Sequence, residues 1–434
     1  MRVTLLKPNF APRRAADAMQ PLELALLAGL TPPDVEVEVR DERVEPLPAA
    51  LETDLAAITV QTFTARRAYS LADELRARGV KVVLGGYHPT AMPAEAALHA
   101  DAVVAGEAEH VWADVVGDAR RGALAPVYRQ GSPSSLEGLR YERGPLAGKR
   151  YLFVRPMELQ RGCRYHCDFC SVTQFHGGTV RARPVREVVA EIEALGARTL
   201  LFVDDNLLGD RAWLKDMLLA IAPLRLRWGC QISTEVTRDP EILALMARAG
   251  CAAALVGFES LEGENLRQMR KPAKASTVAG HVERLHDHGI MVYASFVFGY
   301  DGDGPDVFDR TLEFARASRF FLANFNTLSP MPGTPLWERL RAEGRLLRDD
   351  WWLDPRFPYG EVAFRPARMS PEQLRDGCLR VRREFFGASS IAARLLERRA
   401  NARDPGRALL YLAANWVCRA ELRSKMREVG RAHP

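Results

Sequence analysis

Three cysteines on one short segment are the residues of this 434-residue chain best suited to chemistry. They lie in the run Gly162-Cys163-Arg-Tyr-His-Cys167-Asp-Phe-Cys170, with three and then two residues between the thiols. Three thiolates on one loop can ligate three irons of a four-iron, four-sulfur cluster and leave the fourth iron open to a small molecule. The spacing therefore predicts a [4Fe-4S] cluster with Cys163, Cys167 and Cys170 as its ligands.

The residues alone leave two other interpretations of this segment open. A structural zinc site needs a fourth cysteine or histidine, and His166 lies inside the loop, where its ring would have difficulty joining the thiols. A redox-active dithiol needs only one C-x-x-C pair and gives Cys163 no role. The remaining cysteines are single thiols in apolar stretches, which is typical of small buried side chains: Cys230, Cys251, Cys378 and Cys418.

A series of alternating strands and helices surrounds the cysteine segment. A first strand is expected at 152–154, just before the cysteines, and further apolar runs predict strands at 200–203, 228–232, 252–258, 291–298 and 321–327. Helical periodicity falls between them, at 185–195, 211–221, 240–248, 276–288 and 306–317. Such strand–helix units predict a whole or partial parallel barrel, with the cysteine loop at its mouth.

The residues before the cysteines predict a second parallel sheet. Strands are expected at 3–6, 35–39, 55–60, 80–84 and 102–105, and helices at 22–30, 66–78 and 110–121. In an open doubly wound sheet a ligand lies beyond the carboxyl ends of the strands, where glycines let the backbone approach a phosphate or a flat ring. No G-x-G-x-x-G follows the first strand, which argues against NAD or FAD.

The chain divides into four expected parts. Residues 1–130 form the first sheet domain, 131–150 are a linker rich in Gly, Pro, Ser and charge, and 151–345 form the barrel. Residues 346–434 are expected to be mostly helical, with helices at 371–386, 389–399 and 408–429. The last helix is amphipathic and carries several arginines; we expect it to pack on the barrel, with contact to an anionic surface or an apolar substrate as the alternative.

Composition bounds the class of protein. Hydrophobic residues make up 47% and charged residues 26%, which excludes disordered, collagenous and disulfide-scaffold proteins. The net charge of +5 is too small to argue for nucleic acid, and no basic RNA-binding module is appended. No apolar run is long enough for a signal peptide or a membrane span. We expect a cytoplasmic enzyme with reduced thiols, no nucleic-acid partner and at most peripheral membrane contact.

The C-x3-C-x2-C loop, with an aromatic residue before its last cysteine, resembles the radical S-adenosylmethionine (SAM) superfamily. The resemblance extends over about residues 1–345. Its barrel motifs are Phe202-Val-Asp-Asp-Asn206, Gly257-Phe-Glu-Ser260, Phe298-Gly-Tyr300 and Pro330-Met-Pro-Gly-Thr-Pro335. The domain before the barrel is similar to the cobalamin-binding domain of one large class, which includes hopanoid methylases and a cyclase of chlorophyll synthesis. That similarity is carried by Gly85-Gly86-Tyr-His88-Pro-Thr90 and Gly106-Glu-Ala-Glu109.

This resemblance implies an α/β fold, with a flavodoxin-like doubly wound parallel sheet followed by a partial (β/α)6 TIM-type radical SAM barrel and a small helical C-terminal region. It also implies that SAM binds the open iron through its amino and carboxylate groups. The implied SAM contacts lie at the barrel's strand ends: Asp204, Asp205, Asn206, Glu235, Glu259, Ser260 and Gly299. The alternatives are that the polar residues cap the following helices and that Gly299 belongs to an ordinary core strand rather than leaving space for adenine.

The resemblance implies cobalamin contacts at the strand ends of the first sheet: Gln61, Thr62, Gly85, Gly86, His88, Gly106 and Glu107. The D-x-H-x-x-G motif, whose histidine ligates cobalt in many cobalamin proteins, is absent, as it commonly is in the radical SAM class. Cobalamin would then be bound without a histidine on cobalt. The alternative is a domain that has lost the cofactor and only caps the barrel.

The implied activity is that of a cobalamin-dependent radical SAM enzyme, most simply a methyltransferase acting on an unactivated carbon of a small-molecule or lipid-like substrate. The cluster would reduce SAM to methionine and a 5′-deoxyadenosyl radical, and methylcobalamin would supply the methyl group to the substrate radical. The alternatives are a cyclase, rearrangement enzyme or oxidase without methyl transfer, and a non-catalytic cobalamin or cluster sensor. An electron donor such as a flavodoxin or ferredoxin is an expected partner. The sequence singles out no catalytic side chain.

Overall fold

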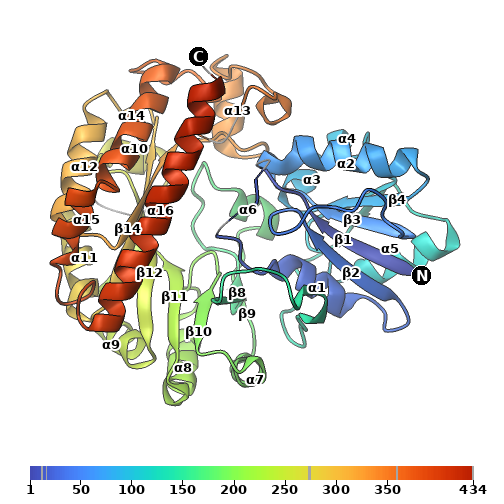
Figure 1. Cartoon of the computed structure of the whole chain (residues 1–434), viewed down its shortest axis with the longest axis horizontal. Coiled ribbons are helices and arrows are strands. Elements are labelled where there is room, and N and C mark those ends of the chain that lie inside the picture. Colours follow the sequence, from blue (N-terminus) through green and yellow to red (C-terminus); the bar gives the residue numbers. More distant parts are fainter. Residues whose placement is uncertain (11–12, 16, 272–274, 358–359, 433–434) are drawn as a thin grey trace.

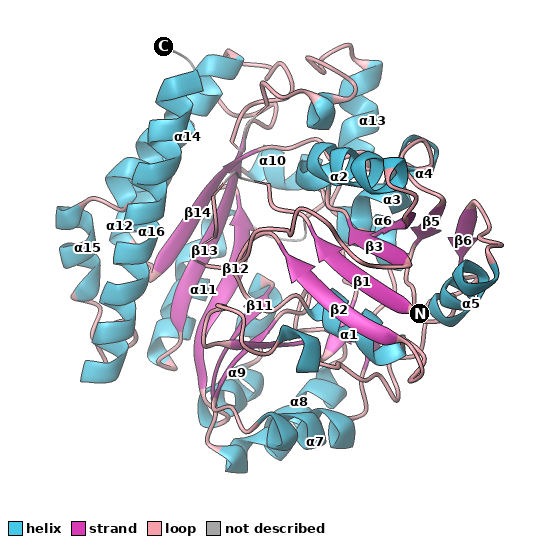
Figure 2. Ribbon diagram, turned by 45° about the vertical axis from the view of Figure 1, so that its right-hand side comes forward, coloured by secondary structure: helices cyan, strands magenta, loops and turns pink. Residues whose placement is uncertain are grey.

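Two parallel six-stranded sheets organise the chain, one formed by its N-terminal part and one by its centre (Figures 1 and 2). The computed structural model describes residues 1–10, 13–15, 17–271, 275–357 and 360–432, with side chains up to residue 423. The blue N-terminal sheet lies on the right of Figure 1, and the green to orange sheet on the left. The expected fold class is confirmed.

The first sheet has the strand order β2-β1-β3-β4-β5-β6, which is flavodoxin-like. Its strands are β1 (Arg2–Lys7), β2 (Glu36–Asp41), β3 (Leu55–Thr59), β4 (Lys81–Gly85), β5 (Ala102–Ala105) and β6 (Val127–Arg129). Its helices are α1 (Leu22–Leu30), α2 (Ala65–Ala77), α3 (Tyr87–Ala91), α4 (Pro93–Ala96) and α5 (Trp112–Arg121), with the 3₁₀ turn η1 (Thr62–Thr64). Strand β6 and the short helices α3 and α4 were not predicted, because each is too short to show a period in the sequence.

Alternation along these strands creates two different cores. Val3 and Leu5 face α1 and α5 on one side of the sheet, in a cluster confined to the N-terminal part of the chain. Leu6 and Ile58 face the other side, in a cluster that continues into the second sheet. Because a parallel sheet must be covered on both faces, the second sheet's domain supplies part of this cover.

The second sheet has the order β14-β13-β12-β11-β10-β7, with β14 and β7 at its two edges, as in a partial barrel. Its strands are β7 (Arg155–Met157), β10 (Thr199–Phe202), β11 (Arg227–Ile232), β12 (Cys251–Glu259), β13 (Met291–Phe298) and β14 (Leu322–Thr327). Its helices and turns are α7 (Val185–Leu195), α8 (Arg211–Ile221), η3 (Ala222–Leu224), η4 (Thr234–Arg238), α9 (Pro240–Arg248), α10 (Gly263–Gln268), η5 (Ala275–Thr277), α11 (Val278–Asp287), α12 (Val307–Ala317) and α13 (Pro335–Ala342).

The first barrel strand lies later than predicted. The apolar residues 152–154 are not in a strand, and Phe153 is 70% exposed. Strand β7 instead pairs Arg155 with Leu200 and Met157 with Phe202 of β10. The proline within β7 is tolerated because β7 is an edge strand, so one side of its backbone needs no ladder hydrogen bond. The prediction of a strand at 152–154 was wrong because it rested on apolar composition alone. The strand forms instead at the residues that pair with β10.

The remaining segments are the stretch between the two sheets and the residues that follow the barrel. Residues 131–150 include the turn η2 (Gly144–Leu146), and Leu136 and Leu146 are buried. After the barrel come η6 (Trp351–Leu353), α14 (Pro371–Phe385), α15 (Ala388–Leu395) and α16 (Pro405–Ala432), the last running along the red end of the chain in Figure 1. A capping box of Ser370 and Gln373 starts α14. Within the described residues, no helix has both the length and the apolar content to cross a membrane.

Candidate active site

The cysteine loop is held between a small ribbon and a short helix. The antiparallel strands β8 (Gln160–Arg161) and β9 (Arg181–Ala182) precede and follow it, and α6 (Ser171–His176) continues directly from its last cysteine. Gly162 has a φ of +86°, and a Cβ there would lie 1.9 Å from the carbonyl oxygen of Thr179. Only glycine fits this close approach, so the loop can turn sharply just before its first cysteine.

The three loop thiols suit the ligation of several irons. Cys163, Cys167 and Cys170 are partly exposed and form no disulfide, whereas Cys230 and Cys378 are buried. Burial raises the pKa of Cys167 to about 12 and of Cys170 to about 11, so a metal must displace their protons on binding. In the described parts of the chain no three His, Cys, Asp or Glu side chains converge as they would around one ion. A cubane cluster does not require such convergence, since each thiolate binds its own iron.

Two residues at the end of β10 position the loop. The backbone N–H of Gly162 donates to Asp205 Oδ2 at 2.9 Å. The Asn206 amide donates to Cys163 Sγ at 3.9 Å, while its Oδ1 accepts from the Ser233 N–H at 3.0 Å. Both predicted SAM contacts therefore touch the cysteine loop directly.

Asp204 faces away from the loop. It is buried, and its Oδ1 accepts from the N–H groups of Leu159 and Gln160 at 2.8 and 2.5 Å. Burial raises the pKa of its carboxyl to about 8 despite these hydrogen bonds. Asp204 thus holds the backbone of Leu159 and Gln160, where β8 begins. The alternative that these acids cap α8 does not hold, because Asp210 accepts from the N–H of Trp213 at 2.7 Å.

Glu235 fixes the middle of the loop from η4. Its carboxylate accepts hydrogen bonds from the side chains of Arg164 and Tyr165 and, at 3.0 Å, from Arg211. Burial opposes ionisation, but the hydrogen bonds from Arg164 and Tyr165 lower the pKa of Glu235 to about 2. The predicted SAM contact is therefore an ionised anchor for two residues that lie between the first and second cysteines.

Asp168, inside the loop, was missed from the sequence. Its Oδ1 accepts from Tyr300 Oη at 2.6 Å, and its backbone bonds to Met269 and Leu336 at 3.2 and 3.0 Å. The loop is thereby tied to the ends of β13 and α10 and to the start of α13. The acid between the second and third cysteines was the available signal, but its partners lie far away in sequence.

A buried ion pair adjoins the thiols. Lys271 Nζ lies 2.6 Å from Glu259 Oε1, and each side chain is about one-tenth exposed. The charge of Lys271 lowers the pKa of Cys163 and Cys167, against the larger effect of burial. A Cβ on Gly257 would collide with this pair, at 2.2 Å from Glu259 Oε1. This explains the glycine of the Gly-Phe-Glu-Ser run.

Two further predicted SAM contacts, Ser260 and Gly299, are in contact with other residues of the chain. Ser260 Oγ accepts from the N–H of Glu262 at 3.0 Å and from the amide of Asn265 at 3.3 Å, at the start of α10. The space expected for adenine at Gly299 is filled, because a Cβ there would lie 2.7 Å from Leu374 and 3.0 Å from Phe364. The expectation of a gap beside Gly299 is corrected: the C-terminal region, which showed no such role in the sequence, occupies it.

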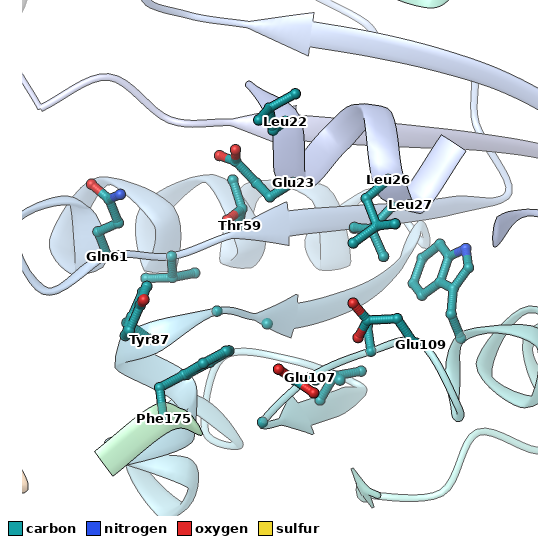
Figure 3. A pocket seen from close by; sticks show the side chains of 18 of the residues that line it. Leu22, Glu23, Leu26, Leu27, Thr59, Gln61, Tyr87, Glu107, Glu109 and Phe175 are labelled. Carbon is teal, nitrogen blue, oxygen red and sulfur yellow. The ribbon is translucent and has the colours of Figure 1, made fainter. Parts of the chain in front are cut away.

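A cavity of about 330 Å³ opens at the carboxyl ends of the first sheet (Figure 3). Leu22, Leu26 and Leu27 of α1 form an apolar side, with Tyr87 and Phe175 on the opposite side. Five predicted cobalamin contacts line it: Gln61, Gly85, Gly86, Gly106 and Glu107. Gly106 has a φ of +94° with open space where a Cβ would lie, which suits a large flat ligand close to the backbone.

The other two predicted cobalamin contacts, Thr62 and His88, are not among the residues that line the cavity. His88 is fully buried, with Nε2 2.9 Å from Glu95 and Nδ1 3.3 Å from Thr62. Glu95 also accepts from Trp352 Nε1 at 3.1 Å, so this network joins the first domain to the C-terminal region. His88 therefore has a structural environment and does not face the cavity.

Glu107 links the cavity to the cysteine loop's helix. Its carboxylate accepts from Arg181 at 2.6 and 2.8 Å and from the N–H of Ser134 at 3.0 Å, and it lies 3.0 Å from His176 Nδ1. These groups hold the pKa of Glu107 far below its usual value, although burial opposes this. His176 was not singled out from the sequence. Its position six residues after the last cysteine, before two glycines, was the only signal.

The cavity and the cysteine loop are neighbours. Phe175 and His176 of α6 line the cavity, and the Phe175 ring lies 4.4 Å from that of Tyr87. His176 Nε2 lies 3.8 Å from Asp205 Oδ2, the oxygen that accepts from Gly162. One side chain thus spans from the cavity to the residue that positions the loop.

Comparison with known proteins agrees with this arrangement. The family model of the radical SAM superfamily matches residues 157–315, and that of the B12 binding domain matches residues 16–116. The chain is 31% identical over 389 residues to bacteriochlorophyllide d C-12(1)-methyltransferase of Chlorobaculum tepidum, covering 86% of this chain and 84% of that protein. It is 28% identical over 351 residues to bacteriochlorophyllide d C-8(2)-methyltransferase of the same organism, covering 76% and 78%.

A solved structure shares the fold. The radical SAM methyltransferase TsrM from Kitasatospora setae, with cobalamin and a [4Fe-4S] cluster bound, superposes with a TM-score of 0.65 at 18% identity, over 87% of this chain and 81% of that chain. The similarity covers both sheets and not only one of them.

Proposed function

Because the chain belongs to the radical SAM superfamily and has a B12-binding domain ahead of its barrel, we propose that it is a methyltransferase acting on an unactivated carbon. Its cofactors are a [4Fe-4S] cluster, SAM and cobalamin. When bound, the cluster supplies the electron that cleaves SAM, and cobalamin carries the methyl group. The two bacteriochlorophyllide methyltransferases support methyl transfer over cyclisation as the activity.

One observation carries this proposal: α6 continues from the cysteine loop straight into the wall of the cobalamin cavity. Phe175 and His176 line that cavity only five and six residues after Cys170. A substrate bound between the two sites would meet both, as methyl transfer to a carbon radical requires. A sensor or a cap without turnover has no need for such proximity.

Separate groups of residues hold the cluster and SAM. Cys163, Cys167 and Cys170 hold the cluster, while Asp205 and Asn206 fix the loop. The buried pair of Glu259 and Lys271 offers one carboxylate and one ammonium beside the thiols. This pair complements the amino and carboxylate groups of SAM, so we assign it to SAM binding.

The first domain holds cobalamin through backbone and apolar contacts. Gly85, Gly86 and Gly106 let the ring approach the strand ends, and the leucines of α1 cover its apolar edge. His88 is unavailable to cobalt because both ring nitrogens are engaged inside the domain. Residues 1–130 thus serve the methyl carrier, and residues 151–345 serve SAM.

The proposed substrate is a hydrophobic small molecule of the kind named for the relatives. The electron donor is a small redox protein such as a flavodoxin or ferredoxin, and the enzyme acts in the reducing cytoplasm, where its ligand thiols stay reduced. The test is an anaerobic assay with a low-potential reductant, cobalamin, SAM labelled in its methyl group and bacteriochlorophyllide-type acceptors. Label in the product is expected. A product changed in structure but without label would instead favour the cyclase or oxidase alternative.

A further inference from the structure

A stripe of apolar side chains on α16 is left uncovered by the described chain. Of the twelve large apolar side chains that are exposed among the described residues, four lie within about three turns of this helix: Leu409, Leu410, Trp416 and Val417, at 69, 42, 51 and 48% exposure. Ala413 and Ala420 are exposed between and beyond them. At the 3.6-residue helical repeat these six residues, the α16 stripe, share an arc of about 120°.

The opposite face of α16 is firmly fixed. Tyr411 Oη donates to the carbonyl of Ile391 at 2.8 Å, and the Asn415 amide donates to that of Phe321 at 3.1 Å. Arg407 donates to the carbonyls of Ala252 and Gly289 at 2.7 and 2.9 Å, at the amino ends of β12 and β13. The stripe is therefore presented on a rigid helix that runs along the outside of the molecule in Figure 1.

The charge around the stripe is positive. Residues 405–420 contain no acidic residue. Beyond Arg407, which the opposite face holds, residues 408–432 contain five basic residues against two acidic ones. Arg423 is exposed one turn beyond the stripe. The Arg419 guanidinium lies 5.4 Å from the ring of Trp416. An apolar arc with a tryptophan and a basic end has the composition of a helix that lies in a membrane interface.

We propose that the α16 stripe binds the surface of a membrane containing anionic lipids. The helix would lie along the interface, with Leu409, Trp416 and Val417 among the acyl chains and Arg423 at the headgroups. A second copy of the chain suits the stripe less well, because a stable protein interface uses roughly 20–30 residues a side and the stripe supplies six. The positive flank favours an anionic surface over a neutral one.

The test is co-sedimentation of the full, cofactor-loaded chain with vesicles of phosphatidylcholine alone or mixed with phosphatidylglycerol. We expect binding to the mixed vesicles, weaker binding to the neutral ones, and loss of binding as salt rises. The double variant Leu409→Glu/Val417→Glu should reduce the bound fraction roughly tenfold or more, because two apolar side chains are replaced by anions. Leu219→Glu, at a leucine of α8 that is 49% exposed, as Val417 nearly is at 48%, is the control and should bind as the wild type does.

Three outcomes would overturn the proposal. The wild-type chain could fail to sediment with the mixed vesicles, or the double variant could sediment as well as the Leu219→Glu control. Light scattering could instead show a dimer that the double variant dissociates, without vesicle binding by either. Unchanged circular dichroism and iron content confirm that the variants are folded. Because the assay requires no turnover, its result is independent of the proposed methyl transfer.

Discussion

His176 Nδ1 lies 3.0 Å from Glu107 Oε1, and this contact joins the end of a strand in the first sheet to the helix that follows the cysteines. Arg181 holds the same carboxylate with two hydrogen bonds, from the strand on the other side of the loop. One buried anion therefore sets the position of the first sheet's cavity relative to the cysteine loop. Its removal should disturb both.

Glu107→Gln should destabilise the chain and weaken cobalamin binding. The amide removes the charge that compensates Arg181 and Arg161, and breaking a buried ion pair costs about 3–5 kcal/mol. Urea denaturation and cobalamin titration measure the two effects. Glu36→Gln, which removes an exposed pair with Arg2, is the control and should change neither. If both variants have the same stability and the same affinity for cobalamin, Glu107 does not hold the cavity and the cysteine loop together.

Glu235→Gln should leave the fold intact, but the variant should lose its iron–sulfur cluster faster in air than the wild type does. Without its charge, Arg164 and Tyr165 are held less firmly, and a partly exposed pair of this kind contributes on the order of 1 kcal/mol, or roughly fivefold in rate. Bleaching of the cluster absorbance after admission of air measures this. Glu241→Gln, whose partner Lys215 lies on the surface, is the comparison. Identical bleaching rates would argue against loop anchoring by Glu235.

Lys271→Met should lower the affinity for SAM by roughly ten- to a hundredfold, the effect of losing one hydrogen bond to a charged group. The methionine side chain has a similar length, so the volume beside Glu259 stays filled, although Glu259 loses its buried cation. Equilibrium dialysis with labelled SAM gives the dissociation constant, and iron content shows whether the cluster is retained. Lys215→Met is the surface control. An unchanged dissociation constant with a full cluster would remove Lys271 from the SAM site.

Asp204→Asn should change how stability depends on pH. The folded chain raises the pKa of Asp204 to about 8 by burial, above its ordinary value of 3.8, so the folded state binds this proton more tightly than the unfolded state does. The resulting stabilisation is complete below about pH 4 and is lost as pH rises to about 8. Asparagine keeps the acceptor for Leu159 and Gln160 but does not titrate.

The free energy of unfolding of the wild type should therefore fall relative to that of Asp204→Asn by about 1.4 kcal/mol per pH unit within this window. Chemical denaturation of both proteins at several values between about pH 5.5 and 7.5 measures the difference. A constant difference over that range would mean that Asp204 is already ionised in the folded chain.

The features that could be predicted from sequence are those encoded locally. The spacing of Cys163, Cys167 and Cys170 is visible within eight residues, and the strands of both sheets except β6 and β7 follow from short apolar runs. The glycines that border the cavity of the first sheet lie at the ends of β4 and β5, where the rule for open α/β sheets predicts a ligand site.

The features that could not be predicted depend on partners distant in sequence. Nothing near Gly299 indicates that Phe364 and Leu374 fill the space beside it. Likewise, the sequence around His88 does not show that Glu95 and Thr62 engage its ring. Polar residues at strand ends are expected to contact a ligand, yet Asp205 and Asn206 instead hold the cysteine loop.

The most direct test of the account is the iron content of anaerobically reconstituted protein, with matched cysteine variants. The wild type and Cys378→Ser, a buried thiol outside the loop, should each bind about four irons per chain and cleave SAM when reduced. Cys163→Ala, Cys167→Ala and Cys170→Ala should each lose most of the iron and all SAM cleavage. Colourless wild-type protein, or loop variants that still cleave SAM, would contradict the central claim that this loop holds the cluster.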